Sequence, residues 1–234
     1  MDKMAVFVEG QTEQLFVERL IKEIAGARSV QLDSVNMIGR VRTVKLKIPD
    51  PLSEKYVLIV NSGSDSTVAS DVRENYDSLV RNGYSAMLAL RDVYPHLLTD
   101  LPALQRRLGY GVKTKPIQVS FVLAVMEIEA WFLAEHTHFE RLHSDLTADR
   151  IAAVLGFDPR VDDMAQRGHP AGDLHAAYKL VGLAYTKRRA NALRTIGALD
   201  FAALYLEVIE RMQALKVLVL SIDSFVSKQA VATT

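Results

Sequence analysis

An apolar run near the start of the chain stops abruptly at a carboxylate, in Met4-Ala5-Val6-Phe7-Val8-Glu9-Gly10-Gln11-Thr12-Glu13. A short continuous apolar run bounded by a turn signal is typical of a strand that is buried on both faces. From Thr12 to Ala27 the apolar residues recur at helical spacing, which predicts a helix. A carboxylate that ends such a strand is costly to desolvate unless a partner offsets its charge, so Glu9 is a candidate functional residue.

Strand-like and helical patterns continue to alternate along the chain. Strand-like apolar runs at 56–60, 85–90 and 117–126 alternate with helical patterns at 64–80 and 96–108, and 30–48 is predicted as strand with turns. Short apolar strands separated by helices predict a mostly parallel, Rossmann-like sheet flanked by helices. We therefore expect a fold of the α/β class.

The pattern changes in the last third of the chain. Residues 127–142 turn helical, and from Thr147 onward no strand is predicted. We expect an α/β domain at 1–135 and an α-helical C-terminal extension at 136–234. A long final helix is predicted by one apolar stripe: Phe201, Leu204, Val208, Met212, Leu215, Val219, Ile222 and Val226. This stripe is expected to pack against the α/β domain, with a homodimer seam as the alternative.

Composition narrows the classes of function. Lys plus Arg and Asp plus Glu both total 28, so the net charge is zero and only a local patch could attract nucleic acid or an anionic membrane. The absence of cysteine excludes disulfides, thiolate metal sites and cysteine nucleophiles. No apolar run approaches the roughly 20 residues of a membrane span, and no secretory signal is expected, so we predict a soluble, cytoplasmic protein.

Carboxylates follow three of the four predicted apolar strands. Glu9 follows the first strand, Asp92 the third, and Glu127 and Glu129 the fourth. Ligands bind at the carboxyl ends of parallel strands, so we expect these carboxylates to converge. Mg²⁺ and Mn²⁺ prefer oxygen ligands, and the pattern therefore predicts a metal site. A strand extending to Glu129 would point both glutamates to one face.

Two of these segments resemble a known family. The run Val8-Glu9-Gly10-Gln11-Thr12-Glu13, ending a strand and opening a helix, resembles the first signature of the TOPRIM domain. It is most similar to the overcoming-lysogenization-defect nucleases and to small stand-alone relatives in bacterial defence loci. The run Glu127-Ile128-Glu129-Ala130-Trp131-Phe132-Leu133-Ala134 resembles the third block of those relatives, and His169-Pro170 matches a pair in their helical tails. The resemblance covers roughly residues 3–135.

The resemblance implies a Mg²⁺- or Mn²⁺-dependent nuclease that hydrolyses nucleic-acid phosphodiesters, in defence against phage or mobile elements. Glu9 would act as general acid/base and metal ligand, and Glu13 as a second catalytic carboxylate. Asp92 would open the family's Asp-x-Asp metal motif. Glu127 and Glu129 would complete the set of metal ligands.

One position departs from the family's pattern, because Tyr94 stands where the family has its second Asp. Either Glu127 and Glu129 supply the missing charge, or the chain is a catalytically degenerate module that binds nucleic acid or a partner protein. A weaker alternative is phosphotransfer or phosphatase chemistry on a small substrate. The expected partners are nucleic acid (DNA or RNA), a partner ATPase and a second copy in a homodimer.

Structural explanations remain open for the acidic residues. Glu13 could be stabilised by the dipole at the start of its helix. Asp92 could cap a turn before Pro95. If Glu127 and Glu129 lay on a helix, they would not face one another.

Basic and histidine clusters add two further expectations. The densest basic cluster is expected to contact nucleic-acid phosphates, with a solvated surface as the alternative; it comprises Lys187, Arg188, Arg189 and Arg194. Three histidines near a helix end are expected to lie on the surface rather than to bind zinc; these are His136, His138 and His143. His169 is expected to precede a helix that begins at Pro170.

Overall fold

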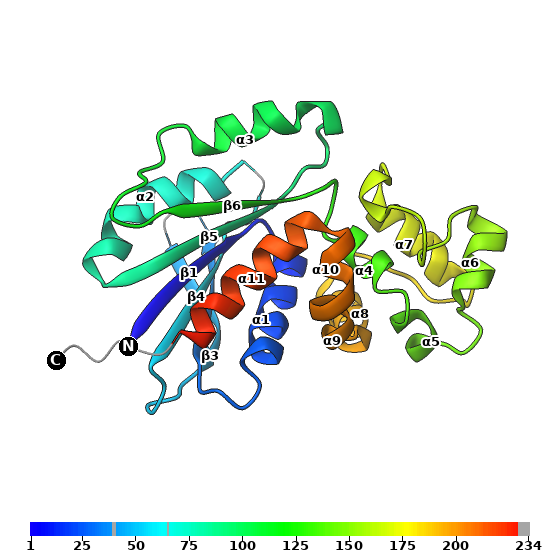
Figure 1. Ribbon diagram of the computed structural model, residues 1–234, viewed down its shortest axis with the longest axis horizontal. Coiled ribbons are helices and arrows are strands. Elements are labelled where there is room, and N and C mark those ends of the chain that lie inside the picture. Colours follow the sequence, from blue (N-terminus) through cyan, green and yellow to red (C-terminus); the bar gives the residue numbers. More distant parts are fainter. Residues whose placement is uncertain (39–40, 65, 229–234) are drawn as a thin grey trace. The chain divides into compact units, whose positions relative to one another are not determined.

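A computed structural model describes residues 1–38, 41–64 and 66–228 (Figure 1). Its six-stranded sheet has the order β3-β2-β4-β1-β5-β6. The strands are β1 (Asp2–Val8), β2 (Gln31–Ile38), β3 (Val41–Ile48), β4 (Lys55–Asn61), β5 (Tyr84–Asp92) and β6 (Val119–Ala124). The predicted α/β class, with a mostly parallel sheet flanked by helices, is confirmed.

The sheet is built around β1. This strand pairs in parallel with β4 on one side and with β5 on the other, where Val8 lies opposite Leu90. β2 pairs in parallel with β4, and β3 runs antiparallel to β2 at the edge of the sheet. The stretch predicted as strand with turns is thus a hairpin.

Successive side chains of β1 point to opposite faces of the sheet, and helices cover both faces. Ala5 and Phe7 face one side, where they join a buried cluster with Val72 and Tyr76 of α2 (Val68–Arg81). The residues between them face the other side. There α1 (Gln11–Ala25) and α11 (Gln213–Ser227) cover the sheet (Figure 1). Burial on both faces is the reason that β1 carries a continuous apolar run.

The chain divides into two compact units, which we call the sheet unit and the helical unit. The sheet unit contains Met1–Arg91, Pro102–Leu123 and the chain from Val217 onward; the helical unit contains Asp92–Leu101 and Ala124–Lys216. This division differs from the predicted single boundary after residue 135. Most of α11 belongs to the sheet unit, where Arg28 donates to Ser227 Oγ at 2.6 Å and Lys55 Nζ lies 5.3 Å from the Phe225 ring.

The helical unit holds short helices joined by turns. They are η1 (Leu98–Asp100), α4 (Glu129–Ala134), α5 (His138–Leu142), α6 (Ala148–Leu155), η2 (Met164–Gln166), α7 (Pro170–Lys179), α8 (Arg189–Ala198), α9 (Phe201–Ala203), η3 (Leu204–Val208) and α10 (Ile209–Arg211). The remaining helix, α3 (Leu101–Gly109), begins at the last residue before the chain returns to the sheet unit. From residue 147 to 228 the described chain contains no strand, as predicted.

The prediction of one unbroken final helix is wrong. The backbone leaves helical geometry at Met212, where φ is −121° and ψ is 85°, so α11 is separate from α10. The stripe itself is buried along its whole length, from Phe201 to Val226. The residues of the stripe up to Leu215 belong to the helical unit, and those from Val219 onward belong to the sheet unit. A continuous apolar stripe does not by itself reveal the break between α10 and α11. Within the described ranges, every helix is too short or too polar to cross a bilayer.

Candidate metal centre

Asp92 is the last residue of β5 and the first residue of the helical unit. Beyond it, Tyr94 N donates to Met126 O at 2.8 Å, so the chain after β5 runs beside the chain after β6. Ile128 N donates to Asp92 Oδ1 at 3.0 Å. Asp92 is thereby held against the start of α4, a tertiary contact that goes beyond a local turn cap.

A sharp turn places the two glutamates. β6 ends at Ala124, and Met126 has φ +57°, a left-handed conformation that is uncommon for residues other than glycine. Glu127 follows in the turn, and Glu129 is the first residue of α4. The strand therefore does not extend to Glu129, which was one of the two alternatives left open for this segment. Both carboxylates still reach one place, because Glu127 lies ahead of the helix rather than on it.

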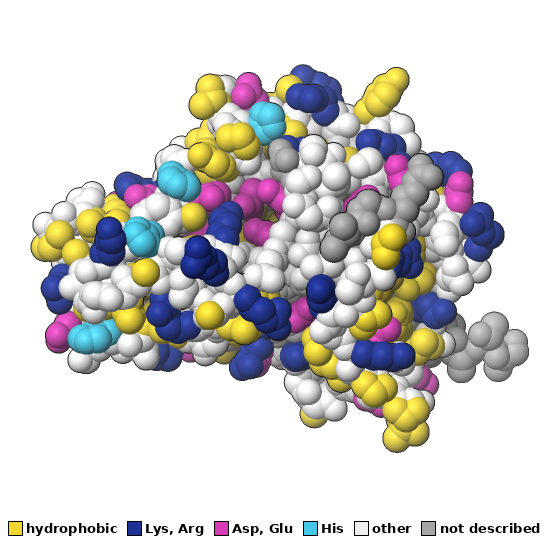
Figure 2. Space-filling view, turned by 180° about the vertical axis from the view of Figure 1, so that it is seen from behind, with side chains coloured by type: hydrophobic (Ala, Val, Ile, Leu, Met, Phe, Trp, Pro, Cys, Tyr) yellow, Lys and Arg dark blue, Asp and Glu magenta, His cyan; other side chains and the backbone are white. Residues whose placement is uncertain are grey.

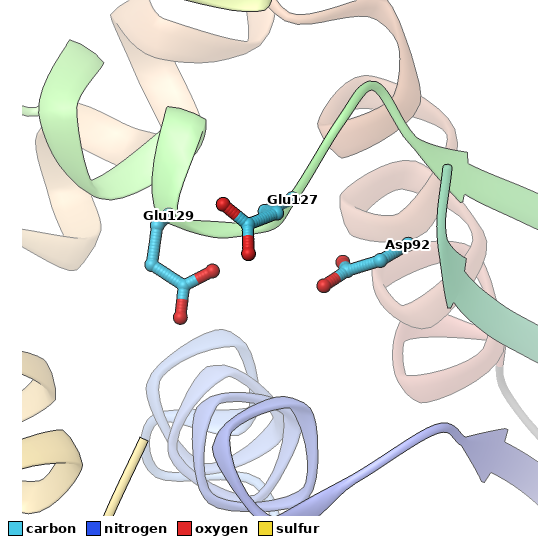
Figure 3. A group of neighbouring side chains, drawn as sticks. All are labelled: Asp92, Glu127 and Glu129. Atoms are coloured by element: carbon cyan, nitrogen blue, oxygen red, sulfur yellow. The ribbon is translucent and has the colours of Figure 1, made fainter. Parts of the chain in front are cut away.

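The three carboxylates of Asp92, Glu127 and Glu129 point toward one another (Figure 3). One oxygen from each lies within 4.8 Å of the others, and all three residues are buried. The donor set consists of oxygen alone, which suits hard divalent cations. We call these residues the acidic trio, and it could hold a metal ion. The sequence prediction that these strand ends converge is met for these three residues.

Lys187 lies against all three members of the acidic trio. Its Nζ is 3.2 Å from Asp92 Oδ2, 3.2 Å from Glu127 Oε1 and 3.4 Å from Glu129 Oε2. The sequence predicted that Lys187 contacts nucleic acid, but it did not predict that Lys187 contacts the acidic trio. A charge run indicates basic character, but the contact joins residues that are 95 positions apart.

Glu127 is held from its other side by α7. Its Oε2 accepts hydrogen bonds from Ala171 N at 2.8 Å and from His169 Nδ1 at 3.0 Å. The positive end of the helix dipole favours a carboxylate there. His169 stacks on Tyr94, with ring centroids 5.2 Å apart. The predicted helix start at Pro170 is confirmed. Tyr94 packs against the imidazole that contacts Glu127.

Glu129 is the most deeply buried member of the acidic trio. Tyr185 Oη donates to Glu129 Oε1 at 2.6 Å, whereas Oε2 is buried and accepts no hydrogen bond from the described residues. Burial raises the pKa of Glu129, although Lys187 and the Tyr185 hydrogen bond act in the opposite direction. Repulsion from Glu127 adds to the increase.

The charges of the cluster do not balance by themselves. Three ionised carboxylates and one ammonium leave a net charge of −2 in a buried site. Buried charge of this size requires a counter-charge or a bound proton. A divalent cation would supply the required charge. The acidic trio therefore fits a metal ion.

The first predicted carboxylates lie in the sheet unit. Glu9 follows β1, and Glu13 is buried in the first turn of α1, as the helix-dipole explanation requires. A Cβ added at Gly10 would lie 2.9 Å from Glu13 Oε2, so glycine at this position leaves room for the carboxylate. The role of Glu9 as general acid/base and metal ligand, and that of Glu13 in catalysis, remain predictions.

The predicted basic cluster is only partly available to a ligand. Arg188 and Arg189 are exposed at the start of α8. Arg194 lies over the Tyr178 ring at 5.7 Å and donates to the carbonyl of Ala184. On the face shown in Figure 2, Lys and Arg side chains are scattered among other side chains rather than gathered in one patch.

The expectation of surface histidines is wrong for His138, which is fully buried. Its Nδ1 lies 2.6 Å from Glu135 O and its Nε2 lies 3.1 Å from Tyr178 Oη. Tyr178 Oη in turn donates to Thr195 Oγ1 at 3.0 Å. This network satisfies the imidazole and explains why a polar ring is tolerated in the core. His143 is exposed, as expected.

Comparisons with known proteins give no identity for the chain. No family model, no curated protein and no solved structure matches it. The functional argument therefore rests on the site itself.

Proposed function

We propose that the protein is a divalent-metal-dependent phosphodiesterase that cleaves nucleic acid and belongs to the TOPRIM superfamily. The observation that carries this proposal is the acidic trio, in which Asp92, Glu127 and Glu129 bring three buried carboxylates together with a residual negative charge. The motif around Glu9 supports nucleic acid as the substrate class. Mg²⁺ or Mn²⁺ is the proposed ion.

The roles of the residues follow from their contacts. Asp92, Glu127 and Glu129 would hold the ion, and His169 and Tyr185 would orient two of these carboxylates through their hydrogen bonds. The ion would supply Lewis acidity toward a phosphodiester oxygen. Arg188 and Arg189 are exposed and would contact the phosphates of the substrate.

The first test is a calorimetric titration of Mn²⁺ into the wild type and into Glu129→Gln. Saturable binding to the wild type that Glu129→Gln abolishes is expected. Glu140→Gln is the matched control, because Glu140 is an exposed glutamate of the same unit, outside the acidic trio. Equal Mn²⁺ affinity of the wild type and Glu129→Gln would show that the acidic trio is not the metal site.

The second test is cleavage of end-labelled single- and double-stranded DNA and RNA with Mn²⁺. Cleavage should be lost in Glu127→Gln and in Glu9→Gln and retained in Glu140→Gln. Metal binding without cleavage of any of the four substrates would contradict the enzymatic part of the proposal.

A non-catalytic module that binds nucleic acid or a partner protein is the second candidate. It is favoured by Tyr94, whose ring stacks on His169 where the resembling family has an acidic ligand. Such a module would bind labelled nucleic acid equally well in EDTA and in Mn²⁺. The nuclease would bind more tightly in the presence of the ion.

A further inference from the structure

Lys187 places its ammonium among the three carboxylates of the acidic trio. Its Nζ is 3.2 to 3.4 Å from one oxygen of each of the three carboxylates. These distances exceed the roughly 2.7–2.9 Å of a strong charge-assisted hydrogen bond. The ammonium is thus shared among the three groups rather than bound tightly to one of them.

A divalent ion would use the same oxygens. Mg²⁺ lies about 2.0–2.1 Å from each of its ligands, so an ion bound by all three carboxylates draws them together around one centre. An ammonium in contact with the same oxygens would then face a doubly charged neighbour at short range. Like charges at such a distance repel, and both cations cannot keep these contacts at once.

Lys187 is able to leave the cluster. Its side chain is 43% exposed, although the carboxylates that it contacts are no more than 4% exposed. It lies in the segment between α7 and α8, outside any helix or strand. A lysine ammonium is strongly hydrated and is carried on a flexible four-carbon stem, so withdrawal into water is a small movement.

We infer that Lys187 is a built-in competitor for the metal: its ammonium fills the cation position of the acidic trio and moves out when a divalent ion binds. This inference rests on the proposed metal-dependent function and adds a condition to it. The site changes between a lysine-filled and a metal-filled form, and the apparent metal affinity is set by the cost of releasing Lys187.

The test is a titration of Mn²⁺ into the wild type, Lys187→Met and Lys179→Met. If the lysine-withdrawn form is populated at about 1–10% without metal, removing the ammonium strengthens binding by about 10- to 100-fold. Lys179 is exposed at the end of α7, so Lys179→Met controls for the loss of one positive charge in the same unit. Unchanged or weaker binding by Lys187→Met would overturn the inference.

A second measurement uses the wild type and does not depend on the folding of a variant. Lysine acetylation by a small acylating reagent is followed by peptide mass spectrometry with and without Mn²⁺. Acetylation of Lys187 is expected to rise several-fold with Mn²⁺. Lys113, paired with Asp77 at 2.6 Å, should be unaffected. Equal or reduced acetylation of Lys187 in the presence of Mn²⁺ would contradict its release.

The two proposals fail in different ways. If neither the wild type nor Lys187→Met binds Mn²⁺, the proposed metal-dependent function is wrong, and the inference falls with it. If both bind with the same affinity and Glu129→Gln abolishes binding, the metal site stands and the inference alone is wrong.

Discussion

At the scale of single residues, His169 determines how Glu127 is presented. Its Nδ1 donates a hydrogen bond to Glu127 Oε2, and the ring of Tyr94 stacks on the imidazole. The side chain of His169 is 57% exposed and contributes little to the core. Its effect should therefore be seen in metal binding rather than in folding.

The variant His169→Ala is expected to weaken Mn²⁺ binding by about 10- to 100-fold, the usual effect of losing a residue that orients a metal ligand. His169→Asn retains a donor near the position of Nδ1 and should restore much of the affinity. Titration calorimetry measures both, and the thermal midpoint of each variant should stay near that of the wild type. Wild-type affinity in His169→Ala would show that Ala171 N is sufficient to hold Glu127.

Glu135 is the residue whose ionisation should stabilise the helical unit. Its carboxylate accepts hydrogen bonds from Thr137, from Arg141 and from Asp200 N at 3.1 Å. Burial opposes its ionisation, but contacts with His138 and Thr137 outweigh burial and lower the pKa of Glu135 below its usual 4.5. Glu135 therefore binds a proton more weakly in the folded state than in the unfolded state.

The lowered pKa of Glu135 determines how the stability of the folded state depends on pH. The stabilisation is complete above pH 4.5 and is lost as the pH falls through the lower folded pKa. At pH 7, Glu135→Gln should reduce the free energy of unfolding by about 1–3 kcal/mol, and the difference from wild type should shrink below pH 4.5. Urea unfolding followed by Trp131 fluorescence measures it, with the exposed Glu140→Gln as control. A difference that does not vary with pH would rule out ionisation of Glu135 as its source.

Single residues also show where prediction from sequence reaches its limit. Asp92, Glu127 and Glu129 were predictable because parallel strands end at the same edge of a sheet. Lys187 and His169 were not, since their contacts with the trio join distant parts of the chain. A basic residue and a His-Pro pair carry no local signal of such a partner.

At the scale of elements, α7 links helix stability to the position of His169. Gly172 lies in its first turn, and a Cβ there would come within 2.7 Å of His169 Cδ2. Glycine inside a helix usually costs about 0.5–1 kcal/mol relative to alanine. Here it leaves room for the imidazole that contacts Glu127.

Gly172→Ala is expected to stabilise α7 by up to about 1 kcal/mol while displacing the imidazole, which can move toward solvent. Mn²⁺ affinity should therefore fall although the thermal midpoint does not. Gly197→Ala is the matched control, because a Cβ at Gly197 in α8 meets no atom of the described residues within 4 Å. If both variants bind Mn²⁺ like the wild type, the contact between Gly172 and His169 has no role in the site.

Elements were predictable where one face or both faces of the chain are buried, and less so where backbone geometry changes. The run Met4–Val8 is nearly the whole of β1. Two features escaped the sequence pattern: the left-handed backbone at Met126 and the break at Met212. Neither residue is glycine or proline, so the usual signals of a turn are missing.

At the scale of the whole molecule, the two units are interleaved along the chain. The chain passes between them after Arg91, after Leu101, after Leu123 and after Lys216. The sheet unit consequently includes most of α11, a helix that begins 89 residues after the end of β6. A division of the chain into consecutive domains misses this, because apolar periodicity does not reveal which surface a helix covers.

These four covalent crossings should couple the unfolding of the two units. Ile222 in α11 is fully buried, and Ile222→Ala is expected to cost about 2–5 kcal/mol. Leu220 in the same helix is 46% exposed, and Leu220→Ala should change stability by less than about 0.5 kcal/mol.

Circular dichroism follows both units during urea unfolding, whereas the single tryptophan, Trp131, reports on the helical unit. If the units unfold together, Ile222→Ala lowers both midpoints equally, although the substitution lies only in the sheet unit. A shift seen by circular dichroism but not by Trp131 would show instead that the helical unit folds on its own, despite its four connections to the sheet unit.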